Sequence, residues 1–171
     1  MALASFPHRG LYAITREGYP DLTSLEQAVA AAIRGGAVVV QYRAKNALNM
    51  ESEALALRDH CRQAGVPFIV NDDVDLAIWV GADGVHLGRT DAALTEARIR
   101  LGESAIIGVS CYDSVELAVE AERQGASYVA FGRFFPSQTK PNTPCARLET
   151  LTEAKRRVSV PVVAIGGITA I

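Results

Sequence analysis

The sequence predicts a single α/β domain of the (β/α)-barrel type. Short apolar runs rich in β-branched residues recur along the whole chain, and the segments between them have the spacing of amphipathic helices. Glycines follow most of these helical segments, shortly before the next apolar run. A doubly wound open sheet is the competing arrangement, but the chain has no G-x-G-x-x-G motif, which weakens its dinucleotide-binding version.

Seven apolar runs, each bounded by glycine, proline or polar residues, are expected to form buried parallel strands. In chain order they are residues 11–15 (LYAIT), 37–43 (AVVVQYR), 67–71 (PFIVN), 84–87 (GVHL), 105–110 (AIIGVS), 127–132 (SYVAFG) and 161–166 (PVVAIG). A full barrel needs eight strands, and the chain stops at GGITAI, just after the seventh run. We therefore expect one domain over residues 1–171 that lacks the eighth βα unit and leaves two strand edges unpaired.

The clearest helices are expected at residues 24–34 and 114–124. In the first, Leu25, Val29 and Ile33 fall on one face, as a helix packed on a sheet requires. Thr23 or Ser24 is the expected N-cap of the first helix, and Asp113 or Ser114 that of the second. Helix ends are expected at the glycines Gly35, Gly36, Gly65, Gly81, Gly102 and Gly125.

Composition narrows the class of partner. Of the 171 residues 49% are hydrophobic and 21% charged, with a net charge of −2, so neither nucleic acid nor an anionic membrane is favoured. No apolar run reaches the roughly 18 residues that span a bilayer, and the N-terminus lacks the pattern of a secretory signal. The three cysteines lack metal-ligand spacing and favour a reducing cytoplasm. We expect a cytoplasmic protein with small-molecule substrates; homo-oligomer formation is left open.

Polar and charged residues follow the predicted strands, where a parallel barrel places its active site. Arg43, Lys45 and Lys140 supply positive charge, and the Gly166-Gly167 pair allows a close backbone approach to an anion. Asp72 and Asp91 supply the oxygen ligands that Mg²⁺ takes together with substrate phosphates. Asp73 and Asp75 instead fit the first turn of a helix. The sequence therefore predicts a site for a diphosphate bridged by magnesium.

Five stretches carry a family resemblance in this order and spacing: QYRAK, NDDVDLA, GADGVHLG, FGRFFPSQTKP and VVAIGGIT. Together they resemble the thiamine phosphate synthase family, over nearly the whole chain. The resemblance implies a (β/α)₈ TIM barrel of that type, here without its eighth βα unit. It also implies an Mg²⁺-dependent transferase of thiamine biosynthesis. That reaction joins 4-amino-2-methyl-5-pyrimidinylmethyl diphosphate to 4-methyl-5-(2-phosphoethyl)thiazole and releases diphosphate.

The resemblance also implies the roles of individual residues. The pyrimidine diphosphate would be bound by the QYRAK segment, by Asn71 and His86, and by Ser110 and Lys140, with one Mg²⁺ on Asp72 and Asp91. The QYRAK segment comprises Gln41, Tyr42, Arg43, Ala44 and Lys45. Ser137, Gln138 and Thr139, with Gly167, would hold the thiazole phosphate. Ser137 stands where the family commonly has threonine, and Gly132-Arg133 where it commonly has Gly-Pro; no role follows for Arg133.

The mechanism implied is dissociative. Arg43, Lys45, Lys140 and Ser110, with Mg²⁺, would stabilise the leaving diphosphate, and the thiazole nitrogen would capture a pyrimidine-methylene cation. No protein nucleophile is required, in line with the lack of a Ser-His-Asp or Cys-His pattern in the sequence.

Two alternatives remain. A related thiazole tautomerase would need no diphosphate-binding cations, and a truncated barrel would be inactive. We expect coupling only when the missing unit is restored or supplied by a partner.

Overall fold

The computed structural model describes residues 6–44, 49–88, 94–135 and 145–168. The strands are β1 (Leu11–Ile14), β2 (Ala37–Tyr42), β3 (Phe68–Asn71), β4 (Gly84–Leu87), β5 (Ile106–Tyr112), β6 (Tyr128–Phe131) and β7 (Val162–Ala164). The helices are α1 (Leu22–Arg34), α2 (Met50–Ala64), α3 (Val74–Val80), α4 (Leu94–Leu101), α5 (Val115–Arg123) and α6 (Leu148–Arg157). Each helix connects two successive strands.

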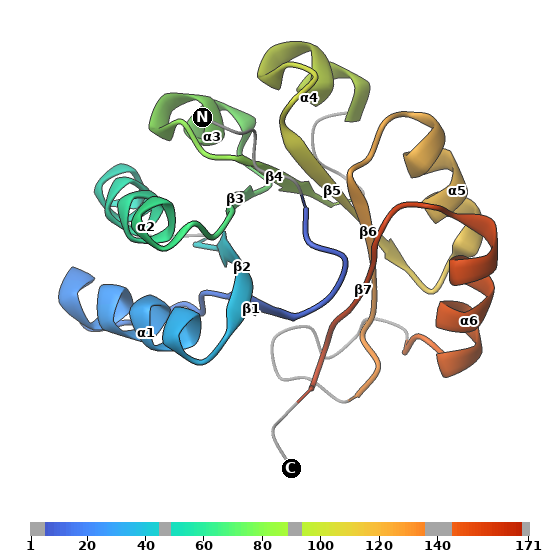
Figure 1. Ribbon diagram of the computed structural model, residues 1–171, viewed down its shortest axis with the longest axis horizontal. Coiled ribbons are helices and arrows are strands. Elements are labelled where there is room, and N and C mark those ends of the chain that lie inside the picture. Colours follow the sequence, from blue (N-terminus) through green and yellow to red (C-terminus); the bar gives the residue numbers. More distant parts are fainter. Residues whose placement is uncertain (1–5, 45–48, 89–93, 136–144, 169–171) are drawn as a thin grey trace.

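The strands form one sheet whose order, β1 to β7, follows the chain, and every adjacent pair is parallel. Figure 1 shows the strands curling around a common centre with the helices on the outside. A doubly wound sheet would place helices on both faces and change its strand order, so the competing arrangement does not apply. The predicted α/β barrel architecture is confirmed as a curled half-barrel of seven parallel strands.

Local signals set the helix ends, with one correction. Gly65 and Gly81 end α2 and α3 in the left-handed conformation, as expected. Ser114 caps α5 by accepting a hydrogen bond from the Leu117 backbone. The prediction of Thr23 or Ser24 as the α1 cap is wrong: Asp21 is the cap, and its carboxylate accepts from the Ser24 backbone at 2.7 Å. The helix therefore begins at Leu22, two residues earlier than its apolar face indicates.

The core has two parts, one on each side of the sheet. The larger part fills the space between the sheet and the helices and includes Leu25, Leu57 and Phe68. The smaller part lies inside the curl and consists of Val39, Ile69, Ile106 and Tyr128, with Phe6, Tyr12, Val38 and Val163 packed against it. Because side chains alternate along a strand, the same strands supply both parts.

The amino ends of the strands are fixed by polar side chains that bond to the backbone. Asp83 accepts a hydrogen bond from the Phe68 backbone at 2.8 Å. Arg98 of α4 donates to the carbonyls of Ala105 at 2.6 Å and of Gly125 at 2.7 Å. The polar side chains at the amino ends are therefore occupied by hydrogen bonds to the backbone. Among the described helices, none combines the length and apolar character needed to cross a bilayer.

Candidate functional site

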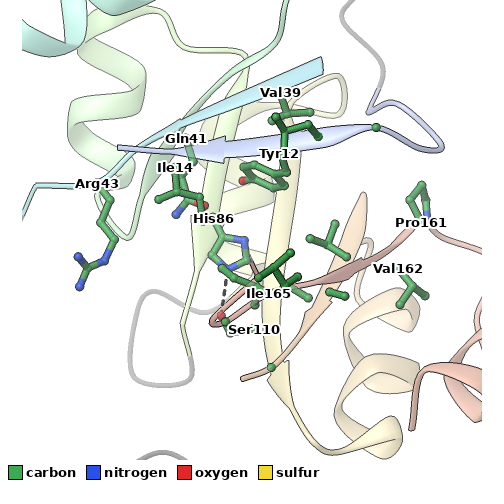
Figure 2. Close-up of a pocket in the computed structure, with 18 of the residues that line it drawn as sticks. Tyr12, Ile14, Val39, Gln41, Arg43, His86, Ser110, Pro161, Val162 and Ile165 are labelled. Atoms are coloured by element: carbon green, nitrogen blue, oxygen red, sulfur yellow. Dashed lines mark hydrogen bonds between the residues drawn. The ribbon is translucent and has the colours of Figure 1, made fainter. Parts of the chain in front are cut away.

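A cavity of about 1200 Å³ lies inside the curled sheet and extends along the strand ends of β1 and β7. Figure 2 shows Tyr12, Gln41, His86 and Ser110 pointing into the same space, with Arg43 nearer its rim. Ile14 pairs with Gln41 across β1 and β2, and Asn71 pairs with His86 across β3 and β4. The parallel register thus brings polar side chains from five strands, β1 to β5, to the wall of this cavity.

Alternation along β2 divides the QYRAK segment between two cavities. Gln41 and Arg43 line the central cavity, whereas Tyr42 and Ala44 line a second cavity of about 420 Å³. Tyr42 is buried on the helix side, where its hydroxyl donates to Glu53 of α2 at 2.6 Å. Burial, with the Glu53 carboxylate beside it, raises the pKa of Tyr42 well above its usual range. Tyr42 therefore supports the helix layer and does not point with Gln41 into the central space.

Asn71 connects the two cavities and lines both. Its side-chain oxygen accepts from Gln41 Nε2 at 2.5 Å, and its amide donates to Asp72 Oδ2 at 2.6 Å. Asp72 has a φ of 65°, in the left-handed region, and its backbone N–H donates to the His86 carbonyl at 2.8 Å. Such backbone strain in a non-glycine residue concentrates at functional sites. Asp73, in contrast, caps α3 through the Leu76 backbone, as the sequence predicts.

Tyr128 and Ser110 both hold the His86 ring. Its Nδ1 lies 2.9 Å from the Tyr128 hydroxyl, and its Nε2 lies 2.9 Å from the Ser110 hydroxyl. No local sequence pattern indicates this serine–histidine pair, because the two residues are 24 positions apart on neighbouring strands. Tyr128 continues the chain of contacts to the Tyr12 hydroxyl at 2.7 Å. Burial raises the pKa of both tyrosines well above the usual range, so both hydroxyls keep their protons.

Arg43 is supported by two residues after β1 that sequence reasoning missed. The buried Thr15 hydroxyl accepts from the Arg43 backbone N–H at 2.8 Å and lies 3.2 Å from its carbonyl. Glu17 forms an ion pair with the Arg43 guanidinium at 3.4 Å. Thr15 and Glu17 are two positions apart in the TREG segment after β1, a spacing that puts both on one side of an extended chain, and this was the available signal.

The exits of β6 and β7 approach each other closely. The backbone N–H of Phe134 donates to the Ile165 carbonyl, and that of Phe135 to the Gly166 carbonyl. A Cβ on Gly166 would lie 2.4 Å from the Arg133 Cβ, so the glycine is required by this contact. Gly167, with a φ of 68°, lines the central cavity, as does Arg133.

Six predicted site residues lie outside the described residues: Lys45, Asp91, Ser137, Gln138, Thr139 and Lys140. Those that the structure describes in the central cavity are Gln41, Arg43, Asn71, His86, Ser110 and Gly167. Asp72 lies at the junction with the second cavity. Within the described ranges, no cluster of three or more histidine, cysteine, aspartate or glutamate residues could hold a metal ion.

Comparison with known proteins identifies the scaffold. The family model for thiamine monophosphate synthase matches residues 11–171. The chain belongs to the thiamine-phosphate synthase family. A thiamine-phosphate synthase of Methylococcus capsulatus is 53% identical over 165 residues, which are 95% of this chain and 73% of that protein. One of Thiobacillus denitrificans is 51% identical over 170 residues, covering 98% of this chain and 80% of the relative.

A solved structure from the same family agrees with the fold. The thiamine phosphate pyrophosphorylase from Pyrococcus furiosus superposes with a TM-score of 0.79 at 38% identity, covering 92% of this chain and 75% of that one. Membership of the thiamine-phosphate synthase family confirms the activity class, a transferase of thiamine biosynthesis, that the motifs imply. The names of these relatives favour the synthase over the tautomerase alternative.

Proposed function

We propose that the central cavity is where this thiamine-phosphate synthase couples the pyrimidine diphosphate to the thiazole phosphate. The observation that carries the proposal is the convergence of Gln41, Arg43, Asn71, His86 and Ser110 on one wall at the carboxyl ends of the strands. Arg43 brings a positive charge, and the serine and amide groups bring hydrogen-bond donors. This set suits an anionic substrate that also carries a polar heterocycle.

The described residues have distinct tasks in this proposal. Arg43 and Ser110 bind the leaving diphosphate, together with Lys45 and Lys140 from the segments outside the described residues. Gln41 and Asn71, already bonded to each other, hold the substrate by their remaining amide groups. Gly167 offers backbone to the thiazole phosphate, with Ser137, Gln138 and Thr139.

The donors at the β3 exit fit a magnesium ion. Asp72 supplies a carboxylate held by Asn71, and Asp91 is its proposed partner. Mg²⁺ usually takes only one or two protein carboxylates and completes its shell with water and substrate phosphate, so a third acidic residue is not needed. When bound, the ion would supply positive charge to the diphosphate. The left-handed backbone of Asp72, which turns the chain at the strand end, supports this proposed role.

The chain's own contribution to the reaction is electrostatic. As the bond between the methylene carbon and the diphosphate oxygen breaks, the leaving group keeps the electron pair and gains charge. Arg43 and Ser110 donate hydrogen bonds to it there, and the thiazole nitrogen then forms the new bond to carbon. Burial of Gln41 and His86 keeps that wall fixed while the charge moves. We place this chemistry in the cytoplasm, because Cys61 and Cys111 are buried free thiols.

A coupling assay with both substrates and Mg²⁺, on the chain with the eighth βα unit restored, tests the proposal. Arg43→Ala should lower kcat/KM by about 100-fold or more, the usual effect of losing a donor to a developing anion. Arg123→Ala is the matched control, because Arg123 is exposed on α5 and pairs only with Glu120 among the described residues. An Arg43→Ala variant that couples as fast as the control would contradict the proposed site.

A further inference from the structure

Four side chains form a continuous hydrogen-bonded chain from the interior of the barrel to its mouth. Tyr12, Tyr128, His86 and Ser110 come from β1, β6, β4 and β5 and are joined at 2.7, 2.9 and 2.9 Å. Tyr128 is fully buried, His86 is buried, and Ser110 lies at the carboxyl end. This chain therefore links a buried phenol to the place where the leaving group is proposed to lie.

The hydrogen bonds that join these four side chains can have one of two donor–acceptor orders, called here the outward and the inward direction. In the outward direction, Tyr12 donates to Tyr128 and Tyr128 to His86 Nδ1, so His86 carries its proton on Nε2 and donates it to Ser110. The Ser110 hydroxyl proton is then available to the cavity. In the inward direction, Ser110 donates to Nε2 and every proton points towards Tyr12. The Ser110 hydroxyl proton is then donated to His86 and is not available to a ligand in the cavity.

The surroundings of Tyr12 favour the outward direction. Its hydroxyl bonds to Tyr128, and its ring packs near Phe6 in the apolar cluster inside the curl. In the inward direction the Tyr12 proton would need a second acceptor, and Tyr128 is its hydrogen-bond partner within the described residues. A buried donor without a partner costs about 1–3 kcal/mol, and an unused acceptor lone pair costs less. In the outward direction the proton without an acceptor among these four side chains is that of Ser110, which lines the cavity, where water or a ligand can accept it.

The group bonded to His86 Nδ1 also distinguishes this arrangement from that of a nucleophilic serine. In a hydrolase triad, a carboxylate accepts the Nδ1 proton, which leaves Nε2 free to take the proton of the serine. Here the group at Nδ1 is the Tyr128 phenol. Burial keeps this phenol neutral, so it can donate, which a triad carboxylate cannot do. The serine in this protein is therefore arranged to give a proton to a ligand and not to His86.

We propose that Tyr128 is a positioning residue that holds His86 in its Nε2–H tautomer and so directs the Ser110 hydroxyl towards the leaving diphosphate. The placement of an anion beside Ser110 rests on the proposed function. The tautomer itself is a property of the substrate-free protein and can be measured separately.

The packing of Tyr128 allows its hydroxyl to be removed without disturbing the ring. The ring stacks on Phe6, with centroids 3.9 Å apart and planes at 11°. It also occupies the space opposite Gly108, where a Cβ would lie 2.0 Å from the ring carbon Cζ. Tyr128→Phe keeps both contacts and deletes the hydroxyl, and with it the donor to Nδ1 and the hydrogen-bond partner of Tyr12. Any change in His86 then reports on the hydrogen bond and not on the cavity wall.

Nitrogen NMR of histidine-labelled protein tests the tautomer directly. The chain has three histidines, so the His86 signals can be assigned by difference with a His86→Asn variant. At alkaline pH, where the ring is neutral, we expect Nε2 protonated and Nδ1 unprotonated. Tyr128→Phe should give a mixture of the two tautomers. An Nδ1–H tautomer in the unmodified chain, or an unchanged tautomer in Tyr128→Phe, would overturn the proposal.

Kinetics supply the second readout. Tyr128→Phe should lower kcat about tenfold while changing KM less than twofold, because the Ser110 donor acts on charge that develops during bond cleavage. Thr150→Val is the matched control: it removes a buried hydroxyl that bonds to Asp113, and neither residue lines the cavity, so it should lower Tm while leaving kcat unchanged. If Tyr128→Phe behaves like this control, Tyr128 is only structural. If the chain shows no coupling even when the eighth βα unit is restored, the proposed function fails, while the NMR result stands independently.

Discussion

The two ends of the barrel use polar residues in opposite ways. At the amino ends, Arg98 and Asp83 bond to backbone groups of neighbouring strand ends. At the carboxyl ends, Gln41, Arg43 and Ser110 face a cavity, and Asp72 occupies a left-handed backbone conformation. The difference shows how this fold separates two requirements: one end stabilises the curl of the sheet, and the other keeps groups available for a ligand. Substitutions at the two ends should therefore affect different measurements.

The largest effect on stability is expected from Arg98→Ala. Arg98 joins the carbonyls of Ala105 and Gly125, and its loss leaves the partly buried Ala105 carbonyl and the exposed Gly125 carbonyl without this donor. We expect the free energy of unfolding to fall by about 2 kcal/mol in chemical denaturation. The kcat/KM of the folded protein should stay unchanged.

Arg100→Ala on the same helix is the control, since Arg100 is paired with the exposed Asp75 and should cost less than about 0.5 kcal/mol. A large loss of kcat/KM in Arg98→Ala at full folding would show that the two ends are not independent.

At Asp72 we expect a loss of activity with little change in stability, the opposite of the result expected for Arg98→Ala. Asp72→Gly removes the carboxylate but suits the left-handed backbone, so the free energy of unfolding should change by less than about 1 kcal/mol. Coupling at limiting Mg²⁺ should fall by about 100-fold, since the proposed metal ligand is gone.

Asp72→Asn separates the loss of the charge from the change in backbone flexibility, because asparagine also tolerates this conformation but carries no charge. Mg²⁺ titration of the coupling rate is the measurement. A rate and a metal requirement unchanged in both variants would remove Asp72 from the site.

The smallest effect is expected from Glu17→Gln. In the substrate-free protein Glu17 holds the Arg43 guanidinium, so an anionic substrate has to compete with this partner. Because Glu17 is half-exposed, the pair is worth less than about 1 kcal/mol, and we expect KM for the diphosphate substrate to fall about twofold. The effect should disappear at high salt. A rise in KM would instead mean that Glu17 orients Arg43 for binding.

The sequence predicted the strands well because each is a short apolar run with clear boundaries. The side of the sheet that a residue faces was harder to predict. The β6 segment is apolar at every position from Tyr128 to Phe131, so it has no alternation that shows which residues face inward. Tyr42 shows the converse problem: its motif suggests ligand binding, yet its position next to Gln41 on β2 places it against α2.

Contacts between segments that are distant in the sequence could not be predicted either. The pairing of His86 with Ser110 depends on the register of β4 against β5, which no local pattern specifies. The partners of Arg43 likewise come from the segment after β1, 26 residues away for Glu17. By comparison, the chemical types at the strand ends were readable, since glycine, arginine and amide residues follow apolar runs directly.

The contact between Gly108 and Tyr128 also constrains how this family can diverge. A side chain at position 108 cannot coexist with the Tyr128 ring, because its first carbon would already overlap that ring. A lineage that first replaced Tyr128 by a smaller residue would gain room for a side chain at 108, whereas the reverse order passes through a destabilised ancestor. Substitutions at these two positions are therefore historically ordered, and relatives with a larger residue at 108 should lack the tyrosine at 128.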